Sequence, residues 1–196
     1  YIEVSEKINK NFICSKLVER NILIKNKNNS EGVQLKCINL SNNNVFNLKN
    51  NLIKGDIDHQ GVIIGSNLAE KLNVKLNQAV TLIDLKNENI NIADKKVVGI
   101  FKTHLPEYDH FVIYGDINEM KYFLNYENSY DSIVINDLNQ EFDKEIIINA
   151  IDHKYYKLFW DNKHNNFINW LLSYDKPVNI LLFFVFLICL LNLFAS

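Results

Sequence analysis

The chain has little proline, glycine and cysteine, and almost no arginine. Its 196 residues include two prolines and six glycines, which excludes collagen-like repeats and low-complexity linkers. Lys and Arg together number 21 against 23 Asp and Glu, and Arg20 is the only arginine. This balance provides no basic surface for nucleic acid and no polybasic patch for anionic lipid. The apolar fraction of 47% indicates a globular chain with a sizeable core.

The three cysteines predict no disulfide framework. Their number is odd, and Cys189 lies in an apolar tail. If residues 11–26 and 32–40 form a hairpin, Cys14 and Cys37 lie well out of register, and a disulfide between them would need a different pairing. We expect small buried hydrophobic side chains at these positions.

Asparagine is abundant, as are lysine and isoleucine. These residues share A/T-rich codons, so we interpret their abundance as genome composition. After glycine, asparagine tolerates left-handed backbone best. We therefore expect asparagines such as Asn73 to occupy helix ends where glycine is common.

The clearest pattern is the C-terminal tail. From Val178 to Ala195, Asn179 and Asn192 are the only polar residues. A membrane-spanning helix needs roughly 20 apolar residues, so the tail predicts a transmembrane helix over 178–196, truncated at its end. The alternative is a core helix or a signal-like helix. Because the chain starts at Tyr1 and ends inside this apolar stretch, we expect it to be a fragment of a longer protein.

Residues 162–177 predict an amphipathic connecting helix. Apolar residues recur there at helical spacing, and Asp161 or Asn162 can cap its start. Trp170 and Tyr174 suit an interfacial aromatic belt, or else they pack on the preceding domain. Pro177 either kinks this helix or opens a new one.

Residues 1–161 predict a water-soluble α+β domain with a mixed sheet and βαβ-type units. We expect a helix end at 2–10, a hairpin of strands 12–25 and 33–38, and an irregular segment at 41–54. A buried strand at 62–64 precedes a helix that Ser66 caps and whose inward face carries Leu68, Ala69 and Leu72. Strands 79–85 and 97–103 follow, joined by a polar connection.

The region 111–160 predicts a βαβαβ layer. Strands are expected at 111–114, 132–135 and 155–160. Asp116 should cap the first intervening helix, with Glu119 at the capping-box distance. Apolar residues at helical spacing over 142–151 mark the second helix.

No arrangement of residues predicts catalysis. Gly61, Gly65 and Ser66 open a helix as an anion site would, but they lack the three-glycine spacing of a dinucleotide site, and we interpret them as a tight strand-to-helix turn. Two acidic clusters each contain a histidine, and we interpret both as turns rather than metal sites; they are Asp56, Asp58 and His59, and Glu107, Asp109 and His110. His104, His153 and His164 are expected at the surface. The sequence thus predicts no catalytic, cofactor-binding or metal-binding residue.

Residues 61–83 read GVIIGSNLAEKLNVKLNQAVTLI. This segment resembles the extracytoplasmic domain of lipoprotein-releasing ABC transporter permeases of the LolC/LolE type and, more widely, the MacB-like periplasmic core domain and FtsX-like permeases. Asn73 and Asn77 stand where that family usually has glycine. The likeness extends over 97–124 and into the approach to a membrane helix, through Trp160, Asn165, Trp170, Leu171, Asp175, Lys176 and Asn192.

The resemblance implies a permease subunit with four membrane helices, this domain lying between the first two. Such permeases pair as homo- or heterodimers and use a separate cytoplasmic ATP-binding subunit, so this chain itself is not expected to be an enzyme. In the lipoprotein-releasing branch, they extract lipoproteins from the inner membrane and pass them to a periplasmic carrier. Residues 1–175 would then lie in the periplasm.

Two departures from the family leave alternatives open. Carrier docking in LolC-type subunits uses an extended, proline-containing hairpin, whereas Asp84–Lys96 is short and lacks proline. We therefore expect the main carrier contact on another chain. Pro177 interrupts a helix that relatives keep continuous. The alternatives are a MacB- or FtsX-like permease that transmits force to another partner or cargo, a membrane-anchored periplasmic binding module, and a hydrolase using the His/Asp clusters.

Overall fold

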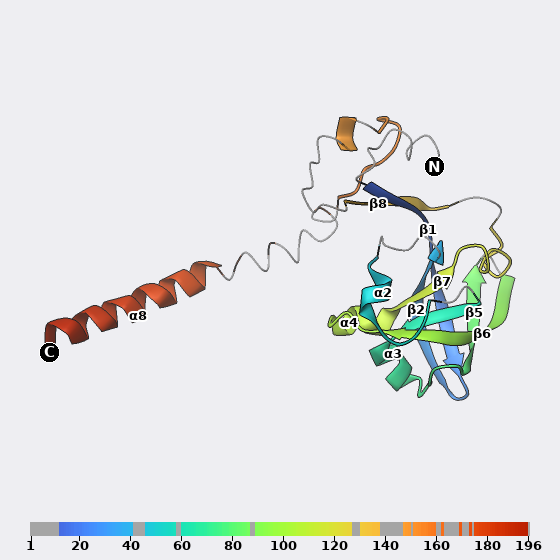
Figure 1. Cartoon of the computed structure of the whole chain (residues 1–196), viewed down its shortest axis with the longest axis horizontal. Helices are drawn as coiled ribbons and strands as arrows, with labels where there is room; N and C mark the ends of the chain where they lie inside the picture. The colour runs from blue at the N-terminus through green and yellow to red at the C-terminus, as the bar shows by residue number, and fades with distance from the viewer. Residues whose placement is uncertain are drawn as a thin grey trace. The chain divides into compact units, whose positions relative to one another are not determined.

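A computed structural model describes most of the chain (Figure 1). It forms two compact units, residues 1–150 and 151–196, which are described separately below. The division of the chain at residues 161 and 177 stays a prediction. The described residues are 12–40, 46–57, 60–86, 89–126, 130–137, 147–149, 151–159, 162, 169, 173 and 175–195.

In its described residues, the first unit is built mainly from β-strands, with short helices α2, α3 and α4 between them (Figure 1). The mixed sheet and helices confirm the predicted α+β class. In chain order the elements are β1 (Phe12–Asn26), β2 (Asn29–Ile38), α2 (Leu48–Asn51), β3 (Leu52–Gly55), β4 (Gly61–Gly65), α3 (Ser66–Lys71), β5 (Ala79–Lys86), β6 (Asn89–Phe101), α4 (Pro106–Phe111), β7 (Val112–Asp116) and β8 (Ser132–Asp137).

Six of the strands pair in a closed ring. The order β2-β7-β4-β6-β5-β1 returns to its start because β1 also pairs with β2. The pairs β2–β7 and β4–β6 are parallel, and the other four are antiparallel. β8 extends the sheet along the first half of β1, and β3 pairs with the end of β6. Closure leaves few exposed edges, which limits unwanted strand pairing.

The apolar side chains form two clusters on opposite faces of the strands. Val62 and Ile64 of β4 belong to the larger cluster, whereas Ile63 between them belongs to the smaller one. In β7, Ile113 and Tyr114 divide in the same way. Strands buried on both faces have continuous apolar sequences, which is why β4 and β7 show no alternation.

The predicted hairpin of β1 and β2 is confirmed, and its turn is shorter than expected. The strands stay paired up to Asn26 opposite Asn29. Cys37 lies opposite Val18, whereas Cys14 pairs with Ile135 of β8. Neither cysteine forms a disulfide, in agreement with the register argument. Burial raises the pKa of the Cys37 thiol, which keeps it protonated and unreactive.

Helix α3 presents the predicted inward face, with Leu68, Ala69 and Leu72 buried. The prediction that Ser66 caps this helix is wrong, because Gly65 occupies the N-cap position and no side chain caps the first turn. The expected left-handed residue after the helix is confirmed at Asn73, which has φ 50°. Asn77 is also left-handed, at φ 68°.

The effect of replacing Asn73 on stability should depend on whether the new residue tolerates a left-handed backbone. Asn73→Gly is expected to raise the free energy of unfolding by about 0.5 kcal/mol, because glycine has no Cβ to strain a left-handed residue. Asn73→Ala should lower it by about 1 kcal/mol. Urea unfolding of both variants, followed by circular dichroism, measures the difference. Equal stability of the two variants would contradict the argument.

Two other regions differ from prediction. Residues 41–54 are not wholly irregular, because they include α2 and most of β3. The βαβαβ layer over 111–160 is wrong, since β7 pairs with β2 and β4 whereas β8 pairs with β1. Residues 155–159 form no strand. Most of the helix expected at 142–151, and the helix end at 2–10, lie outside the described residues.

The segment after β7 forms turns rather than a regular helix over 117–125. Asp116 still accepts hydrogen bonds at its carboxylate from the backbone N–H groups of Asn118 (2.9 Å) and Glu119 (3.4 Å). The capping-box role of Glu119 is wrong, because its carboxylate binds the Lys95 ammonium at 2.7 Å. The expected inward side chains of Ile117, Met120 and Leu124 are buried.

In the second unit, the main described element is α8 (Asp175–Ala195), which includes Pro177. The segment Pro177–Phe194 is long and apolar enough to cross a membrane, with mean hydropathy 2.5. None of this segment is buried within the protein, as expected for a helix that faces lipid and not for a core helix. Trp170 and Tyr174 lie outside the described residues.

Candidate functional site

The hairpin of β5 and β6 carries three strongly exposed aliphatic side chains, Leu85, Ile90 and Ile92. The two strands pair from Ala79 opposite Lys96 to Lys86 opposite Asn89. β1 pairs with β5 only as far as Leu23 opposite Ile83. The end of the hairpin therefore continues past its contact with β1 and is available to a partner.

The structure corrects the expected form of this hairpin. The predicted polar connection is mostly strand, because β6 begins at Asn89. Ile90 and Ile92 point to the same face and are exposed, as their alternation with Asn91 indicates. The expectation that a carrier docks mainly on another chain stays a prediction.

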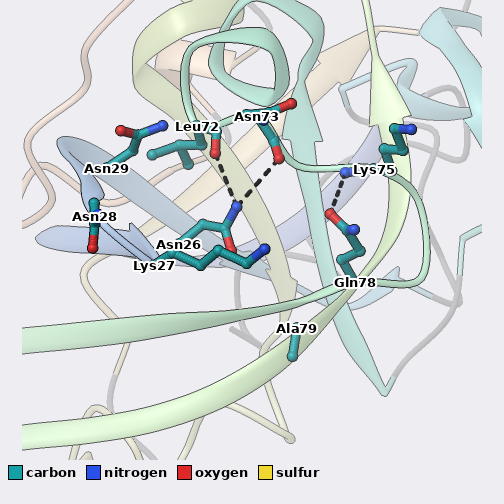
Figure 2. A pocket seen from close by; sticks show the side chains of 9 residues that line it. All are labelled: Asn26, Lys27, Asn28, Asn29, Leu72, Asn73, Lys75, Gln78 and Ala79. Atoms are coloured by element: carbon teal, nitrogen blue, oxygen red, sulfur yellow. Dashed lines mark hydrogen bonds between the residues drawn. The ribbon is translucent and has the colours of Figure 1, made fainter.

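A hollow of about 670 Å³ lies where the β1–β2 turn meets the end of α3. The side-chain amide of Asn26 donates to the backbone carbonyls of Leu72 (2.9 Å) and Asn73 (3.2 Å), as Figure 2 shows. The Gln78 side-chain oxygen accepts from the Lys75 backbone N–H at 2.8 Å. These amides satisfy backbone groups at a helix end and in a turn, so they stabilise the fold.

Backbone packing explains the two glycines of β4, Gly61 and Gly65, without a bound phosphate. A Cβ added to Gly65 would lie 2.0 Å from the Asp109 carbonyl oxygen, and one added to Gly61 would lie 2.4 Å from the Lys96 carbonyl oxygen. Both residues are glycine because other backbone approaches them closely. The interpretation of residues 61–66 as a tight strand-to-helix turn therefore agrees with the packing.

The residues of the second acidic cluster do not converge on one site, because Asp109 and His110 contact different partners. The Asp109 carboxylate is buried and accepts from the Thr103 backbone N–H (2.9 Å) and hydroxyl (2.7 Å). His110 lies 3.5 Å from Glu31 through Nε2, and Lys71 also contacts that glutamate, at 3.0 Å. The described residues contain no group of three or more side chains that could hold a metal ion.

The remaining histidines and acids are dispersed. Asp56 is exposed, and its carboxylate accepts from the Ile57 backbone N–H at 2.7 Å. His104 and His153 are exposed, as expected. Asp58, His59 and His164 lie outside the described residues.

A buried aromatic cluster beside α4 contains a tyrosine whose pKa is raised. Tyr108 and Tyr114 share a hydrogen bond between their hydroxyls. Burial, with a smaller contribution from Tyr108, raises the pKa of Tyr114. The buried ammonium of Lys36 lies over the rings of Phe46 and Tyr108 and 3.5 Å from Glu19. Protonated Tyr114 and the paired Lys36 provide polar contacts beside the smaller apolar cluster. Neither is a nucleophile in this arrangement.

Comparisons with known proteins agree with the sequence resemblance. The chain is 31% identical over 125 residues to the lipoprotein-releasing system transmembrane protein LolC of Buchnera aphidicola subsp. Schizaphis graminum. That match covers 58% of this chain and 31% of LolC, so the chain spans about a third of its relative. No family model matches the chain.

Two solved structures share the fold at low sequence identity. The extracellular domain of the noncanonic ABC-type transporter YknZ from Gram-positive bacteria superimposes with a TM-score of 0.53 at 15% identity, over 76% of both chains. The periplasmic region of MacB from Actinobacillus actinomycetemcomitans gives 0.53 at 12% identity, over 74% of this chain and 67% of that one. The fold is that of a MacB-like periplasmic domain. The resemblance to LolC-type ABC transporter permeases is also confirmed.

In this MacB-like domain, the residues that carried the sequence resemblance have mainly structural roles. Leu68, Leu72 and Val74 are core residues, and Gly65 allows the close approach of α4. Asn73 and Asn77 adopt a left-handed backbone, a conformation that glycine also favours. A fold signature of this kind identifies the domain without identifying its ligand.

The apolar surface beside the hairpin was not predicted from the sequence. Phe111 was expected in a strand, but it ends α4 and is exposed. Leu23 and Leu85 are also exposed. Alternation along β5 could have placed Ile83 and Leu85 on one outer face, but the pairing with β1 that brings Leu23 beside them is a tertiary contact.

Proposed function

We propose that the chain is the periplasmic domain and following membrane helix of a lipoprotein-releasing ABC transporter permease. The observation that carries this proposal is the similarity to LolC in a chain that combines a MacB-like domain with a lipid-compatible helix. Residues 1–175 would lie on the periplasmic side of the inner membrane, and α8 would be the second membrane helix.

The proposed role is mechanical and needs no catalytic group on this chain. A separate cytoplasmic subunit would bind and hydrolyse ATP, and a second permease subunit would complete the membrane part. The motion of the ATP-binding subunit would pass through α8 to the periplasmic domain. This domain would extract the lipoprotein cargo and present it to a carrier. A closed ring of strands around an apolar core suits this role, because close-packed interiors have low compressibility and transmit strain.

Depletion of the protein from its own cells tests the proposed cargo. Lipoproteins destined for the outer membrane should accumulate in the inner membrane, because their extraction stops while their synthesis continues. Fractionation of the two membranes and detection of an abundant lipoprotein measures this. Unchanged lipoprotein distribution after depletion would reject the lipoprotein-releasing function and favour a MacB- or FtsX-like permease with another cargo or partner.

The proposed topology predicts a specific labelling pattern. Tyr122 is 91% exposed, so a cysteine there should react with a membrane-impermeant maleimide. We expect Tyr122→Cys to be labelled once the outer membrane is made permeable, with the inner membrane intact. A cysteine at buried Leu35 is the matched negative control. Labelling of residue 122 that requires disruption of the inner membrane would contradict the periplasmic placement.

A further inference from the structure

A hollow of about 470 Å³ lies on the outer surface of β1, β2 and β5. It is found where β5 parts from β1, past their last paired residues, Leu23 and Ile83. Its volume falls within the range of about 300–1,000 Å³ that is usual for sites that bind small molecules. The separation of the two strands thus gives an otherwise paired sheet a concave surface that a ligand could occupy.

Gly32 forms part of the floor of this hollow, directly opposite Leu23 in the β1–β2 hairpin. A Cβ added to Gly32 would have no atom of the described structure within 4 Å, and its backbone is not left-handed. Neither backbone conformation nor internal packing therefore requires glycine there. A glycine inside a strand often marks a place where a ligand approaches closely.

The walls of the hollow are apolar and exposed to water. Leu85 of β5 is 60% exposed, and Phe111 at the end of α4 is 53% exposed. Leu23 of β1 is a third exposed apolar side chain beside Gly32. An occupant that covers these side chains removes apolar surface from water, which favours its binding.

Among the described residues, no charged side chain lines the hollow. Its polar side chains are the carboxamides of Asn21 and Gln34, which lie directly opposite each other in the hairpin. A carboxamide N–H group can donate to an ester or amide carbonyl, but it cannot form an ion pair with a phosphate. A charged occupant would lose hydration without gaining an ionic partner. The hollow therefore favours an uncharged ligand with carbonyl oxygens and a long apolar part.

A peptide strand does not match the centre of this hollow. Leu23 pairs on both sides, with Gly32 of β2 and with Ile83 of β5, so its backbone offers no free strand edge. A peptide bound there would remove its own N–H and C=O groups from water without replacing their hydrogen bonds. A hydrocarbon chain has no polar groups to desolvate, so an acyl chain fits this surface better than a peptide.

We propose that the hollow over Gly32 binds an acyl chain of the lipoprotein cargo, with a carbonyl of the lipid anchor at Asn21 and Gln34. This inference rests on the proposed function, which makes a lipid-anchored protein the cargo. Such an anchor holds its acyl chains in uncharged ester and amide linkages, whereas a membrane phospholipid carries a phosphate. The uncharged lining therefore favours the anchor over a phospholipid. The hollow would shelter from water a chain that has left the bilayer.

Photo-crosslinking with a synthetic lipopeptide tests the contact. The probe is a tripalmitoyl cysteinyl peptide with a diazirine in one acyl chain, added to the full chain in nanodiscs of phosphatidylethanolamine and phosphatidylglycerol. After irradiation and proteolysis, mass spectrometry should find adducts on residues 21–34. Excess lipopeptide without the diazirine should remove these adducts, whereas the same peptide without acyl chains should not.

Two results of this experiment would overturn the proposal. One is labelling confined to α8, which would place the probe in the bilayer alone. The other is equal labelling of residues 21–34 by a phosphatidylglycerol that carries the same diazirine chain, which would assign the hollow to membrane lipid.

Gly32→Phe fills the hollow and gives an independent measurement. Its side chain has open space, so the melting temperature should stay unchanged. Labelling of residues 21–34 should fall at least tenfold, and Tyr122→Phe, the exposed control, should be labelled like the unaltered chain. Gln34→Glu keeps the volume and should also lower the labelling, because a carboxylate cannot donate to the carbonyl and loses hydration beneath the chain. Unchanged labelling of both variants would reject the proposal.

Lipoprotein fractionation in cells separates failure of this site from failure of the proposed function. Cells depleted of the native protein and supplied with Gly32→Phe should retain lipoproteins in the inner membrane. Normal lipoprotein distribution with Gly32→Phe, in cells where depletion alone blocks it, would reject the acyl-chain site and leave the proposed function standing. Unchanged distribution after depletion itself would reject the function, and with it the cargo assigned to this site.

Discussion

Gly65→Ala should strongly destabilise the MacB-like domain. The added Cβ would lie 2.0 Å from the Asp109 carbonyl oxygen and 2.7 Å from its Cα, both backbone atoms. Neither can move without shifting α4, which the buried Asp109 carboxylate ties to Thr103. We expect the free energy of unfolding to fall by about 3 kcal/mol or more, a large part of a domain's total.

Gly32→Ala is the matched control, because it makes the same chemical change in another strand. With no atom near its Cβ, alanine at residue 32 should be neutral or stabilise by about 0.5–1 kcal/mol. Urea unfolding of the full chain in detergent, followed by circular dichroism, gives both values. Equal effects of the two substitutions would show that packing at Gly65 does not limit stability.

The second large effect concerns α8. Changing Val185 and Ile188 to lysine together should abolish membrane integration of the chain. Each lysine near the centre of a span costs about 2.5–3.5 kcal/mol on an insertion scale, and two lie within one helical turn. Both native side chains are exposed, so the substitutions break no packing contact within the described structure.

Carbonate extraction of membranes measures the outcome. The unaltered chain and a Val185→Leu, Ile188→Leu control should stay in the membrane pellet, and the double lysine variant should move to the soluble or aggregated fraction. Retention of the lysine variant in the pellet would contradict a lipid-facing helix. It would support the alternative, a helix packed against protein.

Several elements were predictable because their signals are local. The apolar run of α8 depends only on composition over about twenty residues. The β1–β2 hairpin follows from alternation on both sides of a turn-rich segment, and the buried face of α3 follows from helical spacing. The left-handed Asn73 follows from the tolerance of asparagine for that backbone.

Other predictions were wrong because contacts with residues distant in the chain determine the structure at those positions. Glu119 stands at the capping-box position, but the Lys95 ammonium of β6 provides an ionic partner that the local N–H cannot match. The βαβαβ order over 111–160 assumed that successive strands are neighbours. Instead β7 and β8 pair with strands from the first part of the chain.

The apolar helix, the hairpin, the helix faces and the family resemblance could be predicted from local sequence, because each depends on the spacing of residues that are close in the chain. The closed ring, the close approach at Gly65 and the open space over Gly32 depend on contacts between distant segments, so they became visible only in the folded chain. Gly65 and Gly32 are the same residue type at strand positions. They differ only in what the rest of the chain places beside them, backbone in one case and nothing in the other.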